Sequence, residues 1–105
     1  MKIILIIGLL YCLNQLTFAQ QKYNPNPEAQ KAYNRASVYI DRKMYDKALD
    51  LLNEAIRMDS NFIEAYQQLG DIYRKIGAYN LAKENYKKVL QINPNFLALT
   101  YYGIA

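Results

Sequence analysis

Apolar residues recur three or four positions apart along much of the chain after its first 20 residues, which is the spacing of one face of an α-helix. In the C-terminal half the pattern is interrupted at Gly77, a residue type that accepts the left-handed conformation found just past helix ends. It stops again before Pro94, because the residue that precedes a proline avoids helical angles. We therefore predict one helix that ends near Gly77 and a second over about 80–92.

The same pattern is present 34 residues earlier in the chain. When the sequence is aligned with itself at that offset, the coinciding pairs are Tyr39 with Tyr73, Tyr45 with Tyr79, Ala48 with Ala82, Ile56 with Leu90, Asn61 with Asn95, and Phe62 with Phe96. An ordered set of matches of this kind indicates an internal repeat, with one helix pair in each unit.

Capping residues indicate where the helices begin. Asn26 can cap a first helix over about 27–43, which has proline at its first position, and a second helix follows over about 46–58. Asn61 can cap the third helix, and Glu64 three residues later completes a capping box.

One helix pair cannot bury its apolar faces alone, and a second pair stacked on it closes the core. Small residues are expected where helices cross, since larger side chains would push the helices apart. These small residues are Ala36, Ala48, Gly70 and Ala82. The larger inward-facing set is Leu49, Leu52, Ile56, Leu81, Val89 and Leu90, with Tyr39, Tyr45, Tyr73, Tyr79 and Tyr86 filling the gaps. The predicted fold class is all-α, an α-solenoid of antiparallel helix pairs.

The second unit, residues 63–96, resembles a tetratricopeptide repeat (TPR). Its signature positions hold Tyr66, Leu69, Gly70, Tyr73, Gly77, Tyr79, Ala82, Tyr86 and Pro94. The first unit, residues 29–62, keeps Ala36, Tyr39, Tyr45, Ala48, Leu52 and Ala55 but departs from the pattern at Ala32, Arg35 and Ser60. Residues 97–105 are similar to the start of a third unit. The resemblance implies a TPR superhelix with two full repeats and the start of a third.

The resemblance also implies a scaffold for protein–protein interaction, with a concave groove that holds an extended segment or helix of another protein. Carried over by position, the groove residues are Tyr33, Ser37, Ile40, Asp41, Gln67, Asp71, Arg74, Lys75 and Tyr101, with Gln30 and Glu64 beside them. We expect Tyr33 to be the anchor, since aromatic residues dominate binding hot spots. The alternative is that these positions are ordinary surface residues.

Residues 1–19 have the features of a cleaved secretory signal peptide. Lys2 precedes an apolar run over 3–10, and small Ala19 stands before the expected cleavage point. The run is too short for a membrane span, which needs roughly 20 residues. We therefore expect a linker over 20–28, no membrane span after cleavage, and an exported protein of the periplasm or outer membrane.

Two alternatives to cleavage remain open, an uncleaved membrane anchor and a lipoprotein. A lipid would be attached to Cys12, the only cysteine in the chain. Tyr11 stands where lipoprotein signals need a small residue, which argues against lipidation of Cys12.

Composition favours a binding protein over an enzyme. The chain has no histidine, and its one cysteine falls in the expected signal, which removes most nucleophile–base pairs and most zinc sites. The acidic residues Asp46, Asp50 and Glu54 recur every four positions and could hold a cation, but a solvated helix face is the simpler interpretation. We expect no catalytic residues, no cofactor and no metal.

The charge is mildly basic, with 13 Lys and Arg against 9 Asp and Glu. This excess is too small and too evenly mixed to indicate a nucleic-acid partner. Lys83, Lys87 and Lys88 could mimic a nucleic-acid stripe, and the simpler interpretation is again a solvated helix face.

The Ile-, Lys-, Asn- and Tyr-rich usage and a signal ending in Phe-Ala-Gln resemble exported Bacteroidetes-type envelope proteins of the OmpA family. That resemblance implies a fragment of a larger cell-envelope protein. The alternative function is a structural spacer for a peptidoglycan-binding C-terminal domain, without a ligand of its own. A stack that stops inside its third unit is also expected to self-associate through its open C-terminal end.

Overall fold

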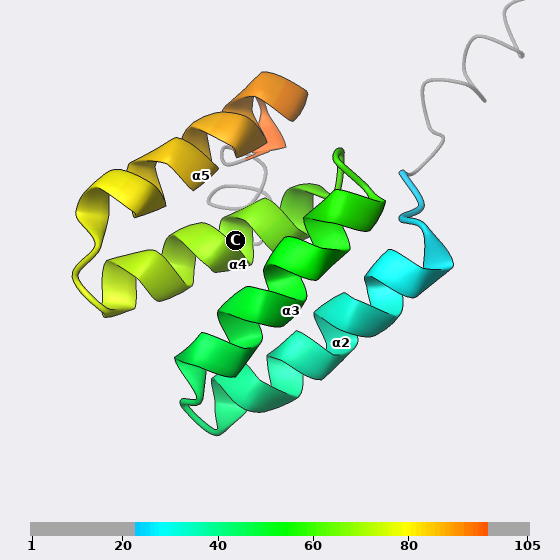
Figure 1. Ribbon diagram of the computed structural model, residues 1–105. Helices are drawn as coiled ribbons and strands as arrows, with labels where there is room; N and C mark the ends of the chain where they lie inside the picture. Colours follow the sequence, from blue (N-terminus) through cyan, green and yellow to red (C-terminus); the bar gives the residue numbers. More distant parts are fainter. Residues whose placement is uncertain (1–22, 97–105) are drawn as a thin grey trace, which may run out of the picture.

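The computed structural model describes residues 23–96, which contain four α-helices and no strand. The helices are α2 (Pro27–Asp41), α3 (Tyr45–Met58), α4 (Ile63–Lys75) and α5 (Tyr79–Ile92). Figure 1 shows α2 and α3 as one antiparallel pair and α4 and α5 as a second, and α4 also packs against α3. The prediction of an all-α chain of stacked helix pairs is confirmed. The expected signal over 1–19 and the start of a third unit over 97–105 lie outside the described residues.

Helix α2 begins as its capping residue predicts. The Asn26 side-chain oxygen accepts the backbone N–H groups of Glu28 at 2.9 Å and Ala29 at 3.4 Å. Pro27, which has no N–H to satisfy, occupies the first helical position. A cap of this type contributes about 1 kcal/mol to stability.

The two turns inside the helix pairs have the same hydrogen-bonded geometry. After α4, the Ala78 N–H donates to the Tyr73 carbonyl at 2.8 Å and the Gly77 N–H to the Arg74 carbonyl at 3.1 Å. This pair of bonds is a Schellman motif, and Gly77 supplies its left-handed residue with φ of 84°.

After α2 the same two bonds form one repeat earlier in the chain. The Met44 N–H donates to the Tyr39 carbonyl and the Lys43 N–H to the Ile40 carbonyl, each at 2.9 Å. Lys43 therefore takes the place of Gly77 and adopts φ of 58°. Helix α2 ends at Asp41, two residues before the predicted end, because the left-handed residue belongs to the turn and not to the helix.

The predicted capping box at Asn61 is wrong. Helix α4 begins at Ile63, and its cap position is taken by Phe62, which makes no side-chain capping bond and is 1% exposed. Burial of the Phe62 ring fixes the start of the helix, so Asn61 lies outside it. The Asn61 N–H instead bonds to the Asp59 carboxylate at 3.2 Å.

The core is continuous from the first helix pair into the second. Its buried members are Ala29, Ala32, Ala36, Ala48, Leu51, Leu52, Ala55, Phe62, Ala65, Leu69 and Ile72. All four predicted small residues, Ala36, Ala48, Gly70 and Ala82, are buried. Gly70 lies under the Tyr86 ring, where an added Cβ would stand 2.5 Å from Tyr86 Cε1. The expected role of small residues at helix crossings is confirmed.

Three predicted core residues are exposed instead, all of them on α5. Tyr79 is 69% exposed and Leu90 40%, whereas their counterparts in the first pair, Tyr45 and Ile56, pack against the core. The counterparts are covered because α4 follows them, and within residues 23–96 no helix follows α5. Leu81 is also exposed, since it lies on the solvent side of its helix.

Candidate peptide-binding groove

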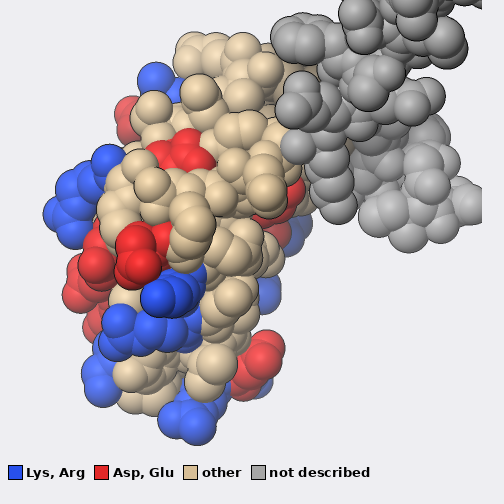
Figure 2. Space-filling view, turned by 90° about the vertical axis from the view of Figure 1, so that its right-hand side faces the viewer, with Lys and Arg blue, Asp and Glu red and all other residues tan. Residues whose placement is uncertain are grey.

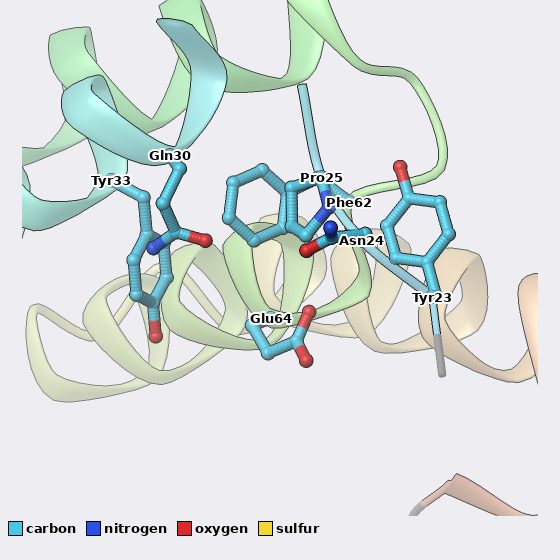
Figure 3. Close-up of a pocket in the computed structure, with 7 residues that line it drawn as sticks. All are labelled: Tyr23, Asn24, Pro25, Gln30, Tyr33, Phe62 and Glu64. Atoms are coloured by element: carbon cyan, nitrogen blue, oxygen red, sulfur yellow. The ribbon is translucent and has the colours of Figure 1, made fainter. Parts of the chain in front are cut away.

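A pocket of about 490 Å³ opens between α2 and the start of α4. An extended segment that precedes α2 forms its third side. We call this cavity the groove pocket. Figure 3 shows the residues that line it, Tyr23, Asn24, Pro25, Gln30, Tyr33, Phe62 and Glu64. Pockets of this volume are within the range that proteins use to bind ligands.

The extended segment is held in place by Asp59, in the loop between α3 and α4. The Asn26 N–H donates to Asp59 Oδ2 at 2.9 Å, and the Tyr23 hydroxyl also bonds to this carboxylate. Burial alone would raise the pKa of Asp59, but hydrogen bonds from Tyr23, Asn26 and Asn61 outweigh it and hold that pKa below its ordinary value. Partial burial, the bond to Asp59 and the charges of Asp59 and Glu64 raise the pKa of Tyr23 to about 12.

Sequence reasoning missed this arrangement. The segment falls in the expected linker over 20–28, and nothing local marks Asp59 as its partner, 33 residues from Asn26. The loop bond from the Asn61 N–H to Asp59 recurs one unit later from the Asn95 N–H to Asn93 Oδ1 at 3.0 Å, but this repeat does not indicate the contact between Asp59 and Asn26.

Tyr33, the expected anchor, lies on the wall of the groove pocket that α2 provides. Its ring centroid is 5.1 Å from that of Phe62, with 32° between the ring planes. Burial raises the pKa of the Tyr33 hydroxyl, and the negative charges of Glu64 and Asp71 raise it further. A hydrogen bond with Gln68 acts in the opposite direction and lowers this pKa. Tyr33 is therefore a half-buried ring in a fixed position, with one side open to the pocket.

Glu64 supplies the one carboxyl group among the residues that line the pocket. Its Oε2 atom is buried and has no hydrogen-bond partner. A buried acceptor without a partner is destabilising, and more so when it carries a charge. Within residues 23–96, Glu64 Oε2 is the one buried side-chain oxygen or nitrogen without a hydrogen-bond partner.

The other groove positions on α2 differ in how they are used. The Ser37 hydroxyl donates to the Tyr33 carbonyl at 3.2 Å, within its own helix. Ile40 packs against the core, and Asp41 is exposed at the end of the helix. Gln30, which lines the pocket, also donates from Nε2 to Asn34 at 2.9 Å.

On α4, Asp71 accepts the Tyr86 hydroxyl at 2.5 Å and lies 3.8 Å from Arg74 Nη2. Asp71 therefore holds the Tyr86 ring over Gly70, and it does not line the groove pocket. Gln67 is partly exposed and Lys75 is exposed. Tyr101 lies outside the described residues.

The described surface carries mixed charge. On the face in Figure 2, Lys and Arg side chains alternate with Asp and Glu rather than forming one basic patch. Tyr86, which stands among the lysines of α5 in the sequence, packs on Gly70 instead of projecting between them. Residues 23–96 contain no group of acidic, histidine or cysteine side chains suited to a metal ion, and none of their helices is long and apolar enough to cross a membrane.

Comparison with known families identifies the fold. A family model described as tetratricopeptide repeat matches residues 63–96, and a second, described as TPR repeat, matches residues 36–77. Residues 36–96 belong to the tetratricopeptide-repeat family. TPR units are in general non-catalytic scaffolds for protein–protein interaction, which is the coarse function that membership supports.

Individual relatives agree with this assignment. The chain is 32% identical over 89 residues to DnaJ protein P58IPK homolog B of Oryza sativa subsp. japonica, which covers 85% of this chain and 18% of that protein. It is 36% identical to human tetratricopeptide repeat protein 12, over 58% of this chain and 9% of the relative. Heat shock protein STI1 of Saccharomyces cerevisiae is 30% identical, over 57% of this chain and 10% of that protein. The chain thus spans less than a fifth of the length of these curated relatives.

Among solved structures, the crystal structure of MamA superposes with a TM-score of 0.66 and 30% sequence identity. The match covers 68% of this chain and 42% of that one.

Proposed function

We propose that this TPR chain is an exported scaffold that binds an extended segment of a protein partner along the groove face of α2 and α4. The observation that carries the proposal is the groove pocket of about 490 Å³, which Tyr33 and Glu64 line together, and Glu64 has a buried carboxylate oxygen without a hydrogen-bond partner. A rigid aromatic ring beside an unsatisfied polar atom is a suitable contact surface for a peptide.

The experiment is capture of the partner from the cell envelope by chemical cross-linking to the tagged full-length chain. Tyr33→Ala should lose the captured protein. Tyr79→Ala should keep it, because Tyr79 is 69% exposed on α5 and does not line the groove pocket. If Tyr33→Ala retains everything that the unmodified chain captures, the groove is not the binding surface, and the spacer function is favoured.

Export is a separate part of the proposal. It is supported by the charged start, apolar run and small-residue end of residues 1–19. N-terminal sequencing of the protein from fractionated cells should give a chain that begins at Gln20 in the periplasmic or outer-membrane fraction. A cytoplasmic chain that keeps Met1 would contradict export.

Self-association is the third part. Tyr79 and Leu90 are 11 positions apart, so they share one face of α5, and both are open where Tyr45 and Ile56 are covered by the next helix. We propose that this face of α5 pairs with an equivalent apolar surface of another copy.

A further inference from the structure

The buried oxygen of Glu64 has no counter-ion in the described part of the chain. The ion pairs within residues 23–96 join Lys31 to Glu28 and Arg74 to Asp71, and none of these four residues lines the groove pocket. No Lys or Arg is among the residues that line the pocket. A cation supplied from outside the chain would therefore meet no competing positive charge from the lining.

Aromatic rings form the walls beside this carboxylate. Figure 3 shows Tyr33 and Tyr23 on opposite sides of the pocket, with Phe62 between them and the Glu64 carboxylate below. The Tyr33 and Phe62 rings pack on each other at 5.1 Å, and Tyr23 is tied to Asp59 on the far side. Ring faces attract Lys ammonium and Arg guanidinium groups, and a nearby carboxylate adds a charged hydrogen-bond acceptor.

The electrostatics of the walls point in the same direction. The negative charge of Glu64 contributes to the raised pKa of both the Tyr23 and the Tyr33 hydroxyls, which lie on opposite sides of the pocket. The space between them is therefore at negative potential. Such a potential favours a cationic side chain and disfavours an acidic one.

We propose that the groove pocket receives a Lys or Arg side chain from the bound segment, with its charged end on Glu64 and its aliphatic part against Tyr33 and Phe62. This inference rests on the proposed function and specifies the chemistry of the partner, an extended peptide with a basic residue at the pocket position. The Gln30 and Asn24 amides at the rim offer hydrogen bonds to the backbone of such a segment.

The test uses NMR titration of the purified chain with acetylated, amidated pentapeptides that differ only in a central arginine, lysine, citrulline or glutamate. The arginine and lysine peptides should shift the amide signals of residues 23–33 and 62–64. Citrulline keeps the shape of arginine without its charge and should bind about tenfold more weakly, and the glutamate peptide should not bind.

Two variants test the role of the carboxylate. Glu64→Gln keeps the shape of the side chain and should weaken binding of the arginine peptide about tenfold, while Glu84→Gln, an exposed position on α5, should leave it unchanged. Equal affinity for arginine and citrulline, no loss in Glu64→Gln, or no shifts from either basic peptide would each overturn the inference.

Cross-linking capture with the same variants separates this inference from the proposed function. If Glu64→Gln retains the envelope partner while Tyr33→Ala loses it, the groove binds a partner but not through a basic residue. If Tyr33→Ala also retains the partner, the proposed function fails as well. Loss of the partner in both variants, with retention in Glu84→Gln, supports both statements.

Discussion

Replacement of Lys43 by glycine is expected to stabilise the chain, although it removes a long side chain from the surface. Lys43 has φ of 58° in the turn between α2 and α3, and Gly77 has φ of 84° at the equivalent point between α4 and α5. The two turns have the same pair of backbone hydrogen bonds. The two repeats thus have a lysine and a glycine at equivalent positions and in the same left-handed conformation.

The magnitude follows from two opposing terms. The left-handed conformation costs a residue with a Cβ about 1–2 kcal/mol, and glycine avoids this cost. Glycine also makes the unfolded chain more flexible, which offsets about 0.4–1 kcal/mol of the gain. We expect Lys43→Gly to raise the free energy of unfolding by about 0.5–1 kcal/mol. In a domain of this size that corresponds to an increase in melting temperature of about 2–8 °C.

The assay is thermal and urea unfolding followed by circular dichroism, with two matched variants. Lys43→Ala keeps the backbone cost and should leave stability nearly unchanged. Gly77→Ala should lower it by about 1 kcal/mol, and this loss must come from the backbone, because nothing lies within 4 Å of an added Cβ at that position. If Lys43→Gly is no more stable than Lys43→Ala, the reasoning from the two turns is refuted.

Three further predictions concern packing, pH and association. Gly70→Ala should lower the free energy of unfolding by about 1–3 kcal/mol, because the added Cβ would meet the Tyr86 ring. This loss should be smaller in a Tyr86→Ala background. A Gly70→Ala variant that is more stable than the unmodified chain would contradict the contact. The pKa of Asp59 is lower in the folded than in the unfolded chain, so ionised Asp59 stabilises the fold fully above its unfolded-state pKa of about 3.9. This stabilisation is lost as the pH falls through the folded-state pKa. In urea titrations between about pH 5 and 3, Asp59→Asn should therefore lose less stability than the unmodified chain. Sedimentation velocity should show concentration-dependent association that Leu90→Glu reduces, and a chain that is monomeric at every concentration would exclude association through α5.

The helices could be predicted from the sequence because their signals are local. Apolar spacing, the Asn26 cap and the left-handed turn at Gly77 each depend on a few neighbouring residues, and the structure has all three. The predictions that failed were those that depend on tertiary packing. Asn61 was a plausible cap until the Phe62 ring entered the core, and Leu90 was a plausible core residue until its helix proved to have no neighbour on that side within residues 23–96.

The candidate site was less predictable than the fold. The spacing of the family pattern brought Tyr33 to the groove, but the opposite wall comes from Tyr23, in a segment that the sequence marks only as a linker. The bond that holds this segment joins Asn26 to Asp59, and nothing in either local sequence indicates the pairing. Glu64 was expected both beside the groove and in a capping box, and the structure places it in the lining of the groove pocket with the cap position taken by Phe62.

The central claim, that the groove face of α2 and α4 binds a protein segment, is tested most directly by site-specific photo-cross-linking in the native host. A photoreactive residue in place of Gln30, at the rim of the groove pocket, is compared with one in place of Lys83, on the exposed surface of α5. The account predicts one discrete protein adduct from the Gln30 position and none from Lys83. No adduct at Gln30, or the same adducts from both positions, would contradict it.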